Sequence, residues 1–134
     1  MPREEVQFLR DGYEALHRGD IETFTALSRE RLHPHFEFHL VWDGRVLRGL
    51  EGTLEWLSDT RETWDDYSQE IVEIADLGDD VLVVLSLSAR GGGSGVPVAQ
   101  ELAVRWSFDE GGKAVLARSF TTKEEALEAA GRPG

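Results

Sequence analysis

The chain has 134 residues, with 26 acidic and 14 basic side chains and a formal net charge of −12 at pH 7. This acidity argues against nucleic acid or an anionic membrane as a partner, because affinity for phosphate groups is carried by clustered lysine and arginine. The chain has no cysteine, which excludes disulfides and thiolate metal ligands, while 40% hydrophobic residues can supply the core of one domain over residues 1–134.

The sequence begins with two predicted helices. Tyr13 lies on an apolar stripe whose members recur three and four residues apart, which is typical of an amphipathic helix over residues 3–18. Gly19 ends this helix, and Asp20 can cap a second, shorter one. The second helix must stop before Pro34, because the residue preceding a proline disfavours helical backbone.

Residues 35–42 alternate between two kinds of side chain, which predicts a strand with one polar face. The apolar positions are Phe36, Phe38, Leu40 and Trp42, and the intervening positions are His35, Glu37, His39 and Val41.

A third helix is predicted to start near Gly49 and Gly52, with Leu54, Leu57 and Trp64 on its main stripe beside Trp56. The segment 51–80 holds eleven carboxylates and one arginine, a net charge of −10. Runs of like charge usually lie on the solvated surface, so we expect this segment to form an acidic, solvent-exposed surface.

The C-terminal half reads as a four-stranded antiparallel meander. Its strands are expected around residues 71–74, 81–89, 96–108 and 114–120, separated by glycine-rich turns. Thr122 and Glu125 have capping-box spacing for a closing helix that Gly131 terminates. Helices at one end and strands at the other predict an α+β domain, with helices on one face of a curved, mostly antiparallel mixed sheet.

The order of these elements, together with several short motifs, resembles the SnoaL-like branch of the nuclear transport factor 2-like superfamily. The motifs are GDIETF, HPHFEFHL, LRGLEG, SGVPV, WSFDEGGKA and EEALEAAG. The resemblance implies a cystatin-like cone of helices and curved sheet around an internal pocket, usually dimerised through the outer sheet face. It implies no single function, because relatives include ketosteroid isomerases, polyketide cyclases, dehydratases and non-catalytic subunits.

The isomerase relatives use a tyrosine and two aspartates, the system that serves as the standard example of pKa tuning. Aligned on the motifs, the tyrosine corresponds to Tyr13, but the aspartate positions correspond to Leu40 and Val104. Steroid isomerisation by that mechanism is therefore rejected.

Three residues remain as candidate catalytic groups: His39 or Glu37 as base, with Tyr13 as donor. This hypothesis describes an isomerase, cyclase or dehydratase that needs no cofactor. Tyr13 could equally be a buried core tyrosine, and Glu37 could pair with an arginine on a neighbouring strand. No metal site is expected, because the usual zinc spacings are absent from the histidine-rich segment.

The alternative hypothesis that we favour is a pocket that binds a small, lipophilic, neutral or cationic molecule. A third is a dimeric structural module without catalysis. The expected pocket residues are Tyr13, Leu40, Trp42, Trp56, Trp64, Leu102, Val104, Trp106 and Ser119, although the tryptophans could simply fill the core.

Leu116 and Phe120 are expected on the outer sheet face, where exposed apolar area predicts a homodimer. The N-terminus does not resemble a signal peptide, and no apolar run is long enough to span a membrane, so a cytoplasmic location is the expectation.

Overall fold

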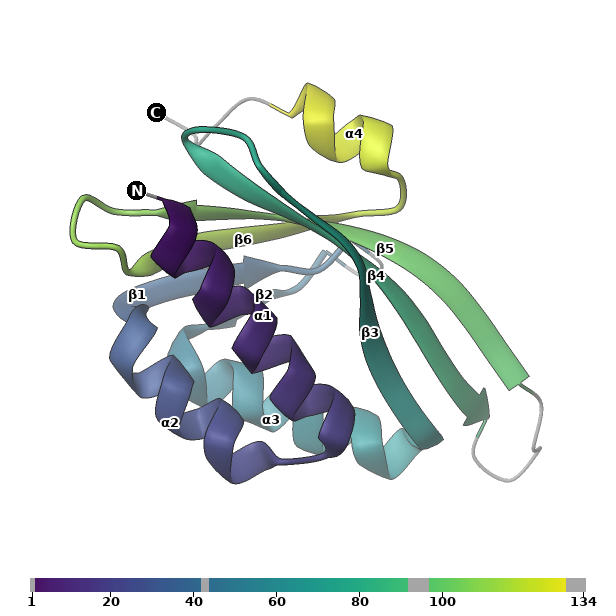
Figure 1. Ribbon diagram of the computed structural model, residues 1–134. Helices are drawn as coiled ribbons and strands as arrows, with labels where there is room; N and C mark the ends of the chain where they lie inside the picture. Colours follow the sequence, from purple (N-terminus) through teal and green to yellow (C-terminus); the bar gives the residue numbers. More distant parts are fainter. Residues whose placement is uncertain (1, 42–43, 92–96, 130–134) are drawn as a thin grey trace.

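The computed structural model describes residues 2–41, 44–91 and 97–129. Within these ranges a six-stranded sheet carries α1, α2 and α3 on one face and α4 on the other (Figure 1). The helices are α1 (Pro2–Arg18), α2 (Ile21–Arg31), α3 (Gly49–Thr63) and α4 (Lys123–Glu128). The strands are β1 (Leu32–His39), β2 (Val46–Arg48), β3 (Trp64–Asp76), β4 (Asp80–Gly91), β5 (Pro97–Phe108) and β6 (Ala114–Phe120). The predicted α+β class is confirmed.

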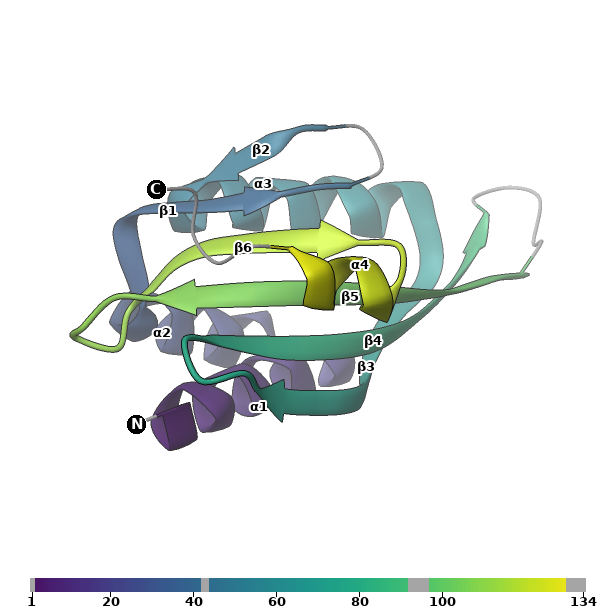
Figure 2. The same cartoon turned by 90° about the horizontal axis from the view of Figure 1, so that it is seen from above.

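The strands lie in the order β2-β1-β6-β5-β4-β3, which Figure 2 shows from above. Strands β3 to β6 form the predicted antiparallel meander, and β1 pairs in parallel with β6. The sheet is therefore mixed, curved and mostly antiparallel, as expected.

Local hydrogen bonds explain where the helices begin. The Asp20 carboxylate accepts from the Thr23 backbone N–H at 3.1 Å, which caps α2. The Thr122 hydroxyl accepts from the Glu125 backbone N–H at 3.2 Å, which confirms the predicted cap of α4. Gly19 adopts a φ of +77° directly after α1, a conformation that a residue with a Cβ rarely takes. The predicted stop at Gly131 lies outside the described residues.

Two boundaries and one strand differ from the sequence prediction. Strand β1 begins at Leu32 and includes Pro34, and its pairing with β6 is irregular between Leu32 and Glu37, as expected where a proline cannot donate a ladder hydrogen bond. Trp64 starts β3 rather than continuing α3, because its backbone pairs with Gly91 of β4. The three-residue strand β2 was not predicted.

The apolar side chains form two layers. The main core lies between the three N-terminal helices and the inner sheet face, where Phe36, Val83 and Val104 are almost completely buried. A smaller cluster of Leu82, Val84, Ala103 and Ala126 lies on the outer face. It joins α4 to the sheet.

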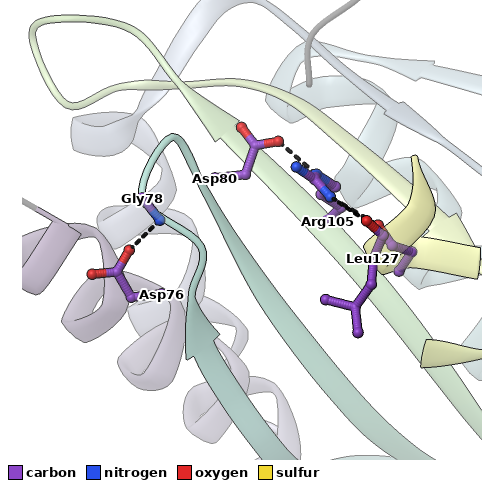
Figure 3. Close-up of polar contacts among 6 residues, drawn as sticks. Asp76, Gly78, Asp80, Arg105 and Leu127 are labelled. Atoms are coloured by element: carbon purple, nitrogen blue, oxygen red, sulfur yellow. Dashed lines mark hydrogen bonds and ion pairs between the residues drawn. The ribbon is translucent and has the colours of Figure 1, made fainter. Parts of the chain in front are cut away.

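A buried ion pair holds α4 against the outer face (Figure 3). Asp80 is buried, unlike the other acidic residues of segment 51–80 whose side chains the structure describes. Its side chain is 3% exposed and accepts from Arg105 Nε at 2.6 Å. Arg105 Nη1 also donates to the Ala126 carbonyl at 2.9 Å, near the end of α4. One guanidinium therefore joins β4, β5 and α4. Among the described helices, none is long and apolar enough to cross a membrane.

We predict that Arg105→Leu lowers the free energy of unfolding by about 3–5 kcal/mol, because it leaves the Asp80 carboxylate buried without its charge partner. Urea denaturation measures this loss. The double variant Asp80→Leu/Arg105→Leu should recover part of it.

The matched control is Lys123→Leu. Lys123 pairs with Glu73 at 2.9 Å, but both side chains are more than 40% exposed, so its loss should cost less than about 1 kcal/mol. Equal losses for the Arg105 and Lys123 variants would contradict the assigned role of the buried pair.

Candidate functional site

A cavity of about 80 Å³ lies between the N-terminal helices and the inner face of the sheet. It is lined by Phe8, Leu9, Gly12, Tyr13, Leu16, Phe24, Ser28, Leu32, Phe36, Phe38, Leu40, Leu47, Thr53, Trp56, Leu57, Tyr67, Gln69, Leu85, Leu87, Leu102, Val104 and Trp106. An engineered apolar cavity of about 150 Å³ accepts benzene, so this cavity suits a smaller molecule unless it expands.

Trp106 lies at the centre of the aromatic wall. Its ring stacks on Phe36 with centroids 5.5 Å apart and planes 11° apart. Phe8, Tyr13 and Phe38 meet it edge to face at 5.9–6.5 Å. Such offset and edge-to-face contacts are the favourable aromatic geometries, so they fix the orientation of the indole.

A second aromatic pair lies on another part of the wall. Trp56 of α3 and Tyr67 of β3 meet edge to face, with centroids 6.3 Å apart. Gln69, two residues further along β3, is 7% exposed and also lines the cavity. Tyr67 and Gln69 were missed in the sequence because the acidic residues around them obscured the alternation of β3.

No acidic or basic side chain occurs among the described residues that line the cavity. Burying an ion without a counter-charge costs several kcal/mol, so this interior favours an uncharged occupant. The described part of the chain also holds no group of three residues arranged to bind a metal ion.

The polar groups of the wall are hydrogen-bond donors or amphoteric groups. The buried Trp106 Nε1–H has no acceptor among the described residues. Burial raises the pKa of the Tyr13 hydroxyl well above its ordinary value of 10, and the nearby Trp106 side chain opposes part of this shift. The Trp106 N–H and the Tyr13 oxygen do not, however, meet the geometry of a hydrogen bond. Burial likewise raises the pKa of Tyr67 to about 12, with Arg61 opposing the shift. Both phenols are therefore protonated at neutral pH.

Six of the residues expected in the pocket line the cavity: Tyr13, Leu40, Trp56, Leu102, Val104 and Trp106. Ser119 does not line it. Its hydroxyl instead donates to the His39 carbonyl at 3.0 Å and accepts from the Val41 N–H at 2.9 Å. Trp42 lies outside the described residues, as does the side chain of Trp64.

The structure places Glu37 and His39 on the outer face of β1, away from Tyr13. Their side chains form a hydrogen bond at 3.1 Å, and Glu37 also pairs with Arg48 of β2. The His39 hydrogen bond and the Arg48 charge hold the pKa of Glu37 below its ordinary value. The cavity residues of β1 are Leu32, Phe36 and Phe38, whose even positions alternate with those of Glu37 and His39. The proposed bases and the proposed donor are therefore not brought together.

Leu116 and Phe120 do project from the outer face, but they are less exposed than expected. Leu116 is 8% exposed, and Phe120 packs against the cluster that includes Ala126 of α4. The expectation of an exposed apolar face is corrected, because Leu116 is buried and Phe120 packs beside α4. A homodimer through this face stays a prediction, and light scattering in solution tests it.

Comparison with known proteins supports the same architecture. The family described as SnoaL-like domain matches residues 9–117. Among curated proteins, none matches this chain. The three solved structures described next are each under 25% identical to this chain, so they show the fold alone.

Three such structures illustrate the likeness. An NTF2-like protein from Burkholderia thailandensis has a TM-score of 0.75 and 23% identity, covering 92% of this chain and 97% of that one. A protein from Jannaschia that is described as a SnoaL-like polyketide cyclase has a TM-score of 0.70 and 18% identity, covering 96% of this chain and 92% of that one. A protein with a ketosteroid isomerase-like fold from Catenulispora acidiphila, in complex with trimethylamine, has a TM-score of 0.71 and 14% identity, covering 94% of this chain and 93% of that one.

We predict that the buried tyrosines make the protein sensitive to alkali. The folded-state pKa of Tyr67 is raised, so the folded protein keeps this proton while the unfolded chain loses it near pH 10. The stabilising effect is complete below pH 10 and is lost as pH rises towards 12.

Between pH 10 and 12, the unfolding free energy of the wild type should fall by about 1.4 kcal/mol per pH unit more than that of Tyr67→Phe. Urea denaturation at several pH values measures the two slopes. Tyr67→Phe keeps the ring contact with Trp56, and parallel slopes would show that the phenol is not desolvated.

Proposed function

The chain belongs to the SnoaL-like domain family, and from that premise we propose that it is a receptor for a small, neutral, lipophilic molecule carrying one hydrogen-bond acceptor. The observation that carries this proposal is the buried Trp106 N–H, which has no acceptor among the described residues and belongs to a residue that lines a mostly apolar, uncharged cavity. A buried donor without a partner costs about 1–3 kcal/mol, which an acceptor atom of a ligand would offset.

The composition of the cavity supports a neutral ligand. An anion would meet aromatic faces and no cation, and the acidic segment on α3 and β3 would repel it during approach. A cation could gain from the ring faces of Trp56 or Trp106, but it would have no buried carboxylate as counter-ion. Trimethylamine, found in the Catenulispora neighbour, has a neutral form of the proposed kind: three methyl groups and one acceptor.

Binding is favoured over acid-base catalysis because the described cavity wall supplies no group that titrates near neutral pH. Tyr13 and Tyr67 stay protonated and can donate, but neither can act as a general base. The alternative, an isomerase, cyclase or dehydratase with His39 or Glu37 as base, would require a side chain from the outer face of β1 to reach the interior. The polyketide cyclase description belongs to the neighbours and adds no base to this chain.

Tetrahydrofuran and cyclopentane provide a test because they have nearly the same shape and differ by one ether oxygen. We predict that Trp106→Phe weakens tetrahydrofuran binding about tenfold relative to cyclopentane, the effect of losing one hydrogen bond of about 1.4 kcal/mol. NMR titration of the backbone amides measures both affinities. Taking their ratio removes the change in cavity shape that the smaller ring causes.

Trp56→Phe is the matched control. It removes an indole from the same cavity, and the tetrahydrofuran-to-cyclopentane ratio should stay within about twofold of the wild type. A Trp106→Phe ratio equal to that of the wild type would contradict the proposed hydrogen bond. Absence of binding by both probes to the wild-type protein would contradict the receptor function.

A further inference from the structure

Gly12 lies in the middle of α1, on the face that packs against the sheet. Its neighbours on this face, Leu9, Tyr13 and Leu16, are all buried and line the cavity, as Gly12 does. A Cβ built on Gly12 would meet nothing within 4 Å, apart from its chain neighbours and the helix's own backbone. The wall of α1 therefore has a gap where every other helical residue type would place a side chain.

The usual reasons for a glycine do not apply at this position. Gly12 is absent from the described glycines with positive φ, whereas Gly19 at the end of α1 has a φ of +77°. No neighbouring backbone approaches closely enough to exclude a Cβ. Glycine inside a helix is destabilising relative to alanine, because it loses more conformational freedom on folding.

We infer that Gly12 determines which ligands fit, by leaving room for the bound molecule beside α1 at the expense of helix stability. This inference rests on the proposed receptor function. The space is small, at about 80 Å³, and a methyl group is comparable in size to a water molecule, which takes roughly 30 Å³ in the liquid. One added methyl group would therefore remove a large part of the volume available to a ligand.

The test is Gly12→Ala, a variant that should fold at least as well as the wild type. We expect its Tm to rise by roughly 2–5 °C, because alanine is the better helix former. At the same time, its affinity for tetrahydrofuran should fall at least tenfold. Greater stability with weaker binding is the signature that a merely structural glycine would not give.

Gly52→Ala is the matched control. Gly52 lies in the first turns of α3 without a positive φ, and its Cβ would make an ordinary contact with Leu47 at 3.4 Å. It does not line the cavity. Its affinity for tetrahydrofuran should stay within twofold of the wild type.

Xenon, measured by ¹²⁹Xe NMR, separates the two claims. If the wild type binds xenon but not tetrahydrofuran, the proposed receptor function is contradicted. In that case the role of Gly12 is still supported if Gly12→Ala binds xenon at least fivefold more weakly than the wild type does. The inference is overturned if Gly12→Ala binds both probes as the wild type does, or if its Tm falls. Wild-type protein that takes up neither probe would overturn both claims.

Discussion

The structure depends on the two-residue period of its strands around Trp106. Along β5, Val104 and Trp106 point into the cavity, while Arg105 and Ser107 point to the outer face. Because neighbouring residues must take opposite faces, the same strand builds an uncharged aromatic interior and a charged exterior. A slip of one residue would turn the Arg105 guanidinium into the apolar interior, away from Asp80, and the Trp106 indole to the outer face.

The charged side chains of the outer face pair with one another and hold neighbouring elements together. Arg105 binds Asp80 and the last carbonyls of α4, and Glu37 and His39 on β1 bond to each other instead of reaching inward. The polar groups of the described cavity wall are therefore all neutral, and the Trp106 N–H has no acceptor among the described residues. This division of charged and uncharged side chains supports the proposed receptor function.

Much of the fold could be predicted from local patterns, and less of the site. Helical periodicity located α1 and the Thr122 cap located α4, because both signals lie within a few residues. Alternation in β1 separated Phe36 from His39 correctly, yet it could not say which face met the cavity, since that depends on pairing with β6. Strand pairing between Trp64 and Gly91 also determines that Trp64 is the first residue of β3. The unpaired indole and the gap at Gly12 are properties of packing, which no single-sequence pattern reports.

We propose that the cavity accepts only uncharged molecules, and the pH dependence of trimethylamine binding is the decisive test. Trimethylamine is mostly protonated at neutral pH. A site selective for the free amine should therefore show an apparent affinity for trimethylamine that rises about tenfold per pH unit from pH 7 to pH 9. Tetramethylammonium, which is always charged, should not bind at either pH. An affinity for trimethylamine that is constant or falls over this range, or measurable binding of tetramethylammonium, would contradict the account.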